Sequence, residues 1–350
     1  MTQKRFDRLI IHAGMLKTGS TTIQAALFNS KMRDATYLDL DMQNQSVACR
    51  LMWGDGLTSE MFHRVNGLNQ ERALQWKQGL EKRLEQQLRT AQERTLVMSA
   101  EWFSRVDVPT LEHVRERLAP HVQDFQVYTY IRRPDDFMTS MFQQIVKVSA
   151  ANYLNLVWPG YKKFLAPLDQ VFGQENVHFR LFNRKQFPDG NVVADFRDWT
   201  GLPQLQADQG NRNTAFSAAA TVLLACYRRH NPDAGSKISD STVKHLIMHL
   251  KTLKAPKLVL HPDLLKKRIS AQQKDVEWME SRIGHSITAS QTQIPDDAVV
   301  IGSEADLKRA AARFSPMLTG DAPCDPPDDP EEAETLAWSR ISAFVETLQK

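Results

Sequence analysis

A lysine between two glycines, near the start of the chain, has the residue types and spacing of an anion-binding loop. Lys17 lies between Gly14 and Gly19. The apolar, β-branched run 9–13 before the loop predicts a buried strand, and 20–28 has no Pro or Gly and predicts a helix. Three candidate capping hydroxyl residues open that helix: Ser20, Thr21 and Thr22. Free backbone N–H groups and the positive end of a helix dipole would face the loop, which indicates phosphate binding.

The loop is close to a Walker A motif, G-x-x-x-x-G-K-[ST], but its lysine is displaced. Gly14 and Gly19 have the required spacing, whereas Ser20 stands where the motif has its lysine. Lys17, two residues before the second glycine, would meet a bound phosphate from the loop side rather than from the helix. An ordinary strand–helix turn with a solvated lysine is the alternative that this local pattern leaves open.

A second set of phosphate-binding residues follows another predicted strand, 125–131. Arg132 comes directly after the strand, Pro134 suits the first turn of the next helix, and Ser140 lies two turns into that helix. An arginine fork and a hydroxyl can hold a phosphate with several donors at once. Arg132 alone could be a solvated helix start, but two such motifs about 115 residues apart, each after a strand, favour a nucleotide site.

A carboxylate that could accept a proton follows the predicted strand 95–99. Glu101 lies at the carboxyl end of that strand, and the loop with Lys17 lies at the end of its own strand. In an open parallel sheet, ligands bind beyond the carboxyl ends of the strands, so we expect both groups at one edge. A carboxylate that only stabilises a helix N-terminus is the alternative. The pattern places no histidine beside that strand end.

Both motifs resemble those of the sulfotransferases that use PAPS (3′-phosphoadenosine 5′-phosphosulfate). The segment 11–24, IHAGMLKTGSTTIQ, is similar to their 5′-phosphosulfate loop and most similar to the bacterial branch. Their 3′-phosphate motif, R-x-P-x-[DE]-x-x-x-S, is matched by Arg132, Pro134, Asp136 and Ser140. The resemblance covers roughly residues 7–220 and extends more weakly to Gly284.

The resemblance implies an α/β fold of the P-loop nucleotide-kinase-like sulfotransferase type, a short parallel sheet flanked by helices. It implies transfer of a sulfuryl group from PAPS to a hydroxyl or amine of an acceptor, with 3′,5′-adenosine bisphosphate as product and no metal. Lys17 would neutralise the bridging oxygen, and Glu101 would take the acceptor's proton, where family members use His or Glu. We expect partial burial to raise the pKa of Glu101. The residues expected to bind the co-substrate are Lys17, Thr18, Gly19, Ser20, Thr21, Thr22, Arg132, Ser140 and, in a late loop, Arg212.

Two other functions are possible for a phosphate loop of this kind. A P-loop kinase-like phosphotransferase would need the lysine after Gly19 and an acidic magnesium ligand at a strand end, and the first is missing. A non-catalytic nucleotide-binding module on the same fold would keep the phosphate loop without turnover. A metal site at His245 and His249, four residues apart on a predicted helix, lacks a third ligand, so we interpret them as part of a helix face.

Composition and charge are those of a globular protein that binds an anion. The 350 residues are 42% hydrophobic and 24% charged. Seven acids and no base lie in 321–334, which leaves the rest of the chain, from a total of +3, at a net charge of +10. The sequence contains no zinc-finger, helix-turn-helix or RNP pattern that would indicate binding to nucleic acid. The three cysteines form no visible framework, and neither a signal peptide nor a membrane span is apparent, so we expect a soluble cytoplasmic protein.

We predict one sulfotransferase domain with a short appendage. The domain covers 1–320, with a PAPS-binding core at about 7–220 and a helical C-terminal part at about 215–320; an acidic, Pro-rich linker (321–334) and a C-terminal helix (335–350) follow. Acceptor contacts are expected in the turn-rich connection 41–67 and in 149–161. A carbohydrate, a lipid head group and a small phenol are all open as acceptors, and the resemblance favours a glycan or glycolipid. The sequence does not specify the oligomeric state or the role of the acidic tail.

Overall fold

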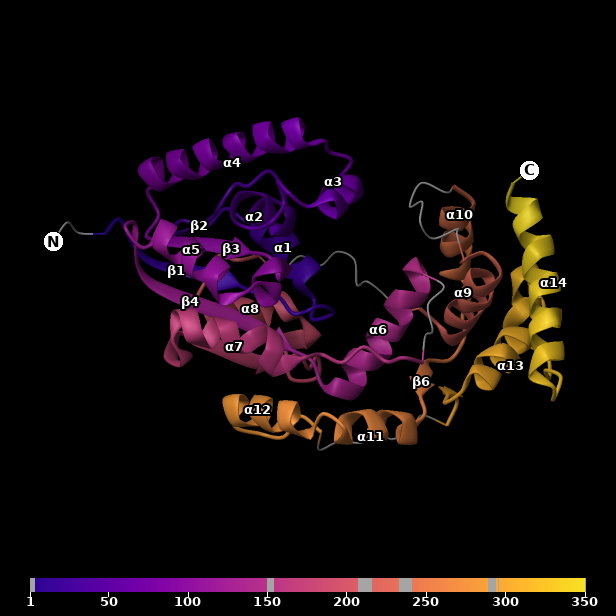
Figure 1. Cartoon of the computed structure of the whole chain (residues 1–350). Coiled ribbons are helices and arrows are strands. Elements are labelled where there is room, and N and C mark those ends of the chain that lie inside the picture. Colours follow the sequence, from indigo (N-terminus) through magenta and orange to yellow (C-terminus); the bar gives the residue numbers. More distant parts are fainter. Residues whose placement is uncertain are drawn as a thin grey trace. The chain divides into compact units, whose positions relative to one another are not determined.

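The computed structural model describes residues 4–149, 154–206, 216–232, 241–288, 294 and 296–349. The chain divides into two compact units, which are described separately (Figure 1). The first comprises Met1–Arg133, Gly160–Gly210 and Lys274–Ile287, and the second comprises Pro134–Pro159, Asn211–Gln273 and Thr288–Lys350. No helix within the described ranges is both long and apolar enough to cross a bilayer.

The first unit is built on a five-stranded parallel sheet with the strand order β2-β3-β1-β4-β5. The strands are β1 Phe6–His12, β2 Ala35–Tyr37, β3 Thr95–Ser99, β4 Val122–Ile131 and β5 Val177–Leu181. The central strand β1 has the fully buried run Leu9–Ile11, as expected for a strand covered on both faces. Its register pairs His12 with Ser99, so that β1 and β3 end side by side. The loop that carries Lys17 therefore starts beside the turn that carries Glu101.

Helices cover both faces of this sheet. On one face, α1 (Ser20–Asn29) packs against α8 (Val192–Thr200) over a core that includes Tyr130 of β4. On the other face, Phe125, an odd-numbered position of the same strand, contacts Phe172 of α7 (Tyr161–Phe172). The helix α5 (Val108–Leu118) packs against α7, and α12 (Gln273–Ile283) lies in the same unit. The predicted α/β class, a parallel sheet flanked by helices, is confirmed.

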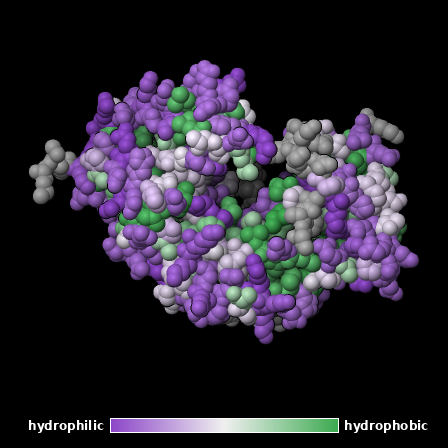
Figure 2. All heavy atoms as spheres, viewed as in Figure 1, coloured by the Kyte–Doolittle hydropathy of each residue, from purple (hydrophilic) through white to green (hydrophobic). Residues whose placement is uncertain are grey.

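The helical spacing of apolar residues in 70–92 predicts an amphipathic helix, and the structure confirms it as α4 (Gln70–Thr90). The side chain of Asn69 caps it by accepting from the backbone N–H of Arg72. Leucines at helical spacing form its buried stripe: Leu80, Leu84 and Leu88. Figure 2 shows a largely hydrophilic surface over this helix, which agrees with the charged residues between those leucines.

The segment 41–67, expected to be a turn-rich connection, instead contains two short helices, α2 (Ser46–Trp53) and α3 (Glu60–Asn66). The glycines at 54 and 56 end α2 after only two turns, and Ser59 then caps α3 by accepting from the N–H of Phe62. Both helices are too short for hydrophobic periodicity to identify them. In the described residues, the regular structure also includes four short 3₁₀ helices: Glu101–Arg105 (η1), Gln174–Asn176, Pro188–Gly190 and Ser315–Thr319.

The second unit is mainly helical and is organised around α9 (Ala218–His230), which is buried at every position from Ala218 to Arg228. The helices α13 (Glu304–Phe314) and α14 (Pro330–Leu348) pack against it. The other elements of this unit are α6 (Pro134–Val148), α10 (Ser241–Leu250), α11 (Pro262–Ser270) and a parallel pair of strands, β6 (Leu258–Leu260) and β7 (Val299–Ile301). The terminal helix begins at Pro330, inside the segment 321–334 expected to be a linker, because Asp329 caps it.

Candidate active site

The loop between β1 and α1 holds Lys17 in an unusual backbone conformation. Lys17 has φ +67°, in the left-handed region, which costs a residue with a side chain roughly 1–2 kcal/mol. Arg132 helps to hold it there, because its Nη1 donates to the Lys17 carbonyl at 2.9 Å. Inside the loop, the buried hydroxyl of Thr18 donates to the Met15 carbonyl at 2.6 Å. The two predicted phosphate motifs, 115 residues apart in the chain, thus meet directly.

The start of α1 offers several unused backbone donors. The helix begins at Ser20 after Gly19, and no side chain caps it, which differs from the capping role expected of the hydroxyl residues. The amide of Thr22 donates to the Gly19 carbonyl at 3.0 Å. In the described part of the chain, four preceding amides make no hydrogen bond: those of Thr18, Gly19, Ser20 and Thr21. Unused amides at a helix start are suited to bind an anion.

Glu101 opens η1 directly beyond β3 and turns toward the loop. Its half-buried carboxylate lies beside Ser20, whose hydroxyl donates to the Met15 carbonyl at 3.4 Å. Gly14 permits this approach, because a Cβ at that position would lie 2.4 Å from Ser20 Oγ and 3.4 Å from Glu101 Cγ. Burial raises the pKa of Glu101, although the nearby Ser20 hydroxyl and the positive charges of Lys17 and Arg105 act in the opposite direction. The direction of this shift agrees with the expected one.

Lys17 responds to the same environment. Burial lowers its pKa, the neighbouring guanidinium of Arg132 lowers it further, and the carboxylate of Glu101 acts against both. The lysine, the carboxylate and the arginine are therefore close enough to influence one another electrostatically. A cation that is partly shielded from water, beside a carboxylate that tends to hold a proton, is the arrangement that transfer of an anionic group requires.

Residues that sequence patterns did not single out hold the Glu101 turn in place. The Ser104 hydroxyl donates to the Glu101 carbonyl at 2.9 Å and lies 3.2 Å from the Gly14 carbonyl. At the start of α2, Ser46 Oγ accepts from the Trp102 amide at 3.2 Å. The fully buried Gln45 accepts from the Ser99 amide at 2.9 Å. Two residues of the segment 41–67 therefore hold the backbone next to Glu101 in place, a role that the composition of the segment did not reveal.

His12 corrects the expectation that no histidine lies beside the end of β3. Its Nδ1 is 2.7 Å from Ser99 Oγ, and its ring packs on Phe196 with centroids 5.1 Å apart. Burial lowers the pKa of this fully buried histidine to about 3, so the ring is uncharged at neutral pH. Its Nε2 is buried without a hydrogen-bond partner among the described residues. We interpret His12 as a packing residue, because an acceptor substrate cannot reach a side chain that is fully enclosed.

The remaining predicted residues lie elsewhere. Ser140 is half-buried on α6, in the second unit, and is therefore not placed relative to Lys17. Arg212 lies outside the described residues, as do residues 150–153 of the segment expected to contact the acceptor. The loop, Glu101 and Arg132 are the predicted site residues that the first unit brings together.

Replacing Gly19 by alanine should destabilise the first unit and weaken nucleotide binding. Gly19 has φ +78°, and a Cβ there would lie 3.0 Å from Phe182 Cε2, so backbone strain and a clash combine. Gly67 is a matched control, since it has φ +63° but open space around a Cβ. We expect Gly67→Ala to cost about 1 kcal/mol in urea unfolding, and Gly19→Ala to cost more. If both variants lose the same free energy of unfolding, the ring of Phe182 moves away from the added Cβ without an energetic cost.

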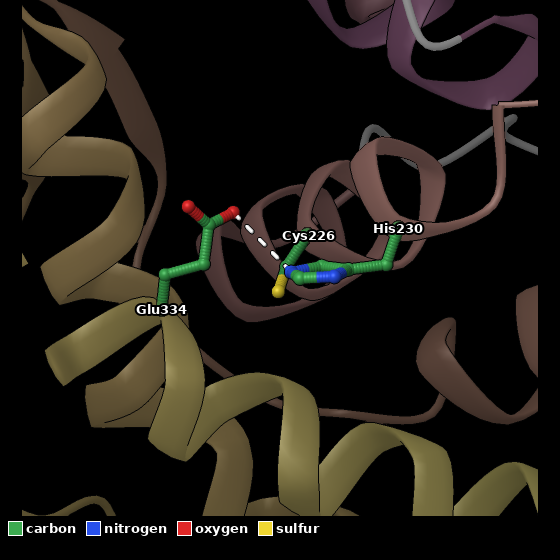
Figure 3. Close-up of side chains that lie close together, drawn as sticks. All are labelled: Cys226, His230 and Glu334. Atoms are coloured by element: carbon green, nitrogen blue, oxygen red, sulfur yellow. Dashed lines mark ion pairs between the residues drawn. The ribbon is translucent and has the colours of Figure 1, made fainter. Parts of the chain in front are cut away.

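The second unit contains a cluster of side chains that could bind a metal ion (Figure 3). Cys226 and His230 of α9 and Glu334 of α14 place one potential ligand atom each within 4.8 Å of one another. However, Glu334 already accepts from Arg229 Nε at 2.6 Å and from Lys308 Nζ at 2.9 Å. Burial raises the pKa of the Cys226 thiol to about 12, so it stays protonated. A divalent cation would meet two positive charges and a neutral thiol, and we interpret the cluster as an ion-pair network that joins three helices.

Glu334→Gln should therefore lower the free energy of unfolding by about 2 kcal/mol at pH 7, because two partly buried cations lose their counter-charge. Burial alone would raise the pKa of Glu334, but hydrogen bonds from Lys308 and Arg229 lower it overall. The stabilisation is thus present above pH 4.5 and lost as the pH falls through the lowered pKa. Urea unfolding at pH 7 and pH 4 measures this, with exposed Glu346→Gln on the same helix as control. A zinc-dependent rise in stability would instead support a metal site.

Comparisons with known proteins find only distant similarities. No protein-family model matches the chain. An uncharacterised protein of Archaeoglobus fulgidus is 24% identical over 134 residues, a match that spans 37% of this chain and 37% of that protein's length. A sulfotransferase from Alicyclobacillus acidocaldarius is similar with a TM-score of 0.43 and 14% identity, over 82% of this chain and 99% of that one. The sulfotransferase domain of the Synechococcus PCC 7002 olefin synthase has a TM-score of 0.31 and 11% identity, over 77% and 97%. At these levels of similarity, only the residues of the site itself can carry a functional argument.

Proposed function

We propose that this protein transfers a sulfuryl group from PAPS to a hydroxyl or amine of an acceptor and releases 3′,5′-adenosine bisphosphate. The observation that carries the proposal is the displaced lysine. Lys17 sits in a strained loop conformation, beside Arg132 on one side and within electrostatic reach of Glu101 on the other. A lysine there can reach the bridging oxygen of a phosphosulfate from the loop side, which a Walker A lysine on the helix does not do.

In the proposed mechanism, most of the catalysis comes from positioning and charge neutralisation. The unused amides of 18–21 hold the 5′-phosphate, and Lys17 neutralises the charge that develops on the bridging oxygen as the S–O bond breaks. Glu101 accepts the acceptor's proton, and burial, which raises the pKa of this carboxylate, suits it to that role. Arg132 and Ser140 are proposed to bind the 3′-phosphate, with Arg212 from the late loop. The sulfuryl group thus leaves the bridging oxygen of PAPS for the acceptor's oxygen or nitrogen, the acceptor's proton goes to Glu101, and 3′,5′-adenosine bisphosphate is the leaving group.

Protection against thermal unfolding tests this proposal before an acceptor is known. 3′,5′-Adenosine bisphosphate should raise the unfolding midpoint in a concentration-dependent way, whereas 5′-AMP should protect less because it lacks the 3′-phosphate. Ser140→Ala should reduce the difference between these two nucleotides. Protection by ATP with magnesium, without protection by the bisphosphate, would contradict the proposal and favour a phosphotransferase.

A further inference from the structure

Arg105 is the last residue of η1, the short helix that Glu101 opens. Its guanidinium lies over the ring of Phe164 on α7, with Cζ 4.2 Å from the ring centroid. Lys163 contributes a second cation at 5.2 Å from the same centroid. Two positive charges therefore contact one aromatic ring, and one of them belongs to the short helix of the proposed base.

Arg105 has no anionic partner among the described residues, in contrast to several arginines of the first unit that pair with carboxylates. Arg94 forms an ion pair with Asp7, and Arg282 forms a bidentate ion pair with Asp169. Arg105 makes no hydrogen bond and no ion pair with any residue that the structure describes, and it is exposed to solvent. Its guanidinium donors are consequently available to a ligand.

The stacking partner of Arg105 is itself held in place. Gly160, at the start of α7, has φ +66°, and a Cβ there would lie 2.8 Å from Phe164 Cε2. Only a glycine lets the ring lie this close to the backbone. A guanidinium stacked on a fixed ring is oriented in advance, so it loses little freedom when it binds a planar oxyanion with two parallel hydrogen bonds.

Electrostatics place this group beside the reaction. The positive charge of Arg105 acts to lower the pKa of Glu101. Desolvation by the surrounding protein lowers the pKa of Arg105, and the carboxylate of Glu101 acts to raise it. A guanidinium remains charged in either case. An anionic group bound to Arg105 would therefore lie next to the carboxylate that is proposed to deprotonate the acceptor.

We propose that Arg105, stacked on Phe164, binds a carboxylate or other oxyanion of the acceptor and so selects an acidic acceptor such as a uronic-acid-bearing glycan. This inference rests on the proposed function, because it identifies the side chain that faces the acceptor next to Glu101. It narrows the open choice of acceptors by their charge. Phe164 and Arg105 are positioning and binding residues in this proposal, and Glu101 remains the base.

Matched probes that differ only in the anionic group test the inference by binding alone. The first pair is methyl β-glucuronide and methyl β-glucoside, and the second is 4-hydroxybenzoate and 4-hydroxybenzyl alcohol. Saturation-transfer NMR on the full chain measures each affinity. We expect at least one acidic probe to bind about tenfold more tightly than its neutral partner, the factor that one charge-assisted contact provides. Arg105→Gln should abolish the difference, and Arg105→Lys should retain part of it.

Arg115→Gln is the matched control, because it removes an exposed arginine of α5 from the same unit. It should leave the discrimination unchanged. Equal binding of acidic and neutral probes by the wild type, or discrimination that survives in Arg105→Gln, would overturn the inference. Bisphosphate protection measured on the same samples keeps the two proposals apart: if protection persists without discrimination, only the role of Arg105 fails. If protection is absent, the proposed function fails while the probe result still decides whether Arg105 binds an oxyanion.

Discussion

Replacing Lys17 by methionine should reduce sulfuryl transfer from PAPS by about 10²–10³-fold, the usual effect of removing one preorganised group that stabilises transition-state charge. Methionine keeps an aliphatic stem and the same left-handed backbone strain, so the change removes only the ammonium. Because the lost interaction forms as the S–O bond breaks, we expect kcat to fall more than the affinity for the bisphosphate product. Single-turnover measurements with radiolabelled PAPS separate these two quantities.

Lys82→Met is the control for this prediction, since Lys82 is exposed on α4 of the same unit. It should turn over at the wild-type rate. The pH dependence adds an independent check: the pKa of Lys17 is lowered from 10.5, so the wild-type rate should begin to fall at a lower pH than a free lysine would predict. A Lys17→Met protein with full activity would remove the lysine from the mechanism.

The strand–loop–helix unit was predictable because its signals are local. An apolar β-branched run, two glycines and a helix without breakers follow one another within about 20 residues, and β1 and α1 begin and end close to the predicted positions. The same reasoning located α4, whose leucine stripe is long enough for its period to be read. It missed α2 and α3, which are only eight and seven residues long.

Contacts between distant segments were not predictable from these patterns. His12 lies beside Ser99 because two strands pair in parallel at one register, and the residues are 87 positions apart. Arg105 meets Phe164 because α7 packs against η1. A sequence pattern specifies which face of an element is buried, but a shift in register would replace each of these pairs by another.

Ser20 lies in the loop where it was predicted, but its side chain makes contacts that were not expected. Its position in the loop indicated that its hydroxyl would bind phosphate, but Ser20 is buried, and its hydroxyl donates to the Met15 carbonyl and lies beside Glu101. In a Walker A motif, this position carries the lysine. The residue that stands in place of the Walker lysine thus packs beside the carboxylate, and the displaced Lys17 and Glu101 are two parts of one arrangement.

Glu101→Gln should lower sulfuryl transfer by about 10²–10⁴-fold, the range expected for the loss of a general base. Glutamine keeps the shape of the side chain and can still meet Ser20 and Gly14, so the site should stay assembled. Bisphosphate protection should remain close to that of the wild type, because Glu101 is not proposed to touch the nucleotide. Turnover near the wild-type rate in Glu101→Gln would assign proton transfer to another group or to water.

Stability should move in the opposite direction from activity. The pKa of Glu101 is raised above 4.5 in the folded protein, so its contribution to stability is complete below pH 4.5 and is lost as the pH rises through the raised value. At pH 8 the ionised carboxylate therefore costs stability, and Glu101→Gln, which cannot ionise, should unfold at a temperature equal to or above that of the wild type. The difference should close at pH 4. Thermal unfolding at both pH values measures it, and a lower midpoint for the variant at pH 8 would mean that Lys17 and Ser20 stabilise the carboxylate more than burial destabilises it.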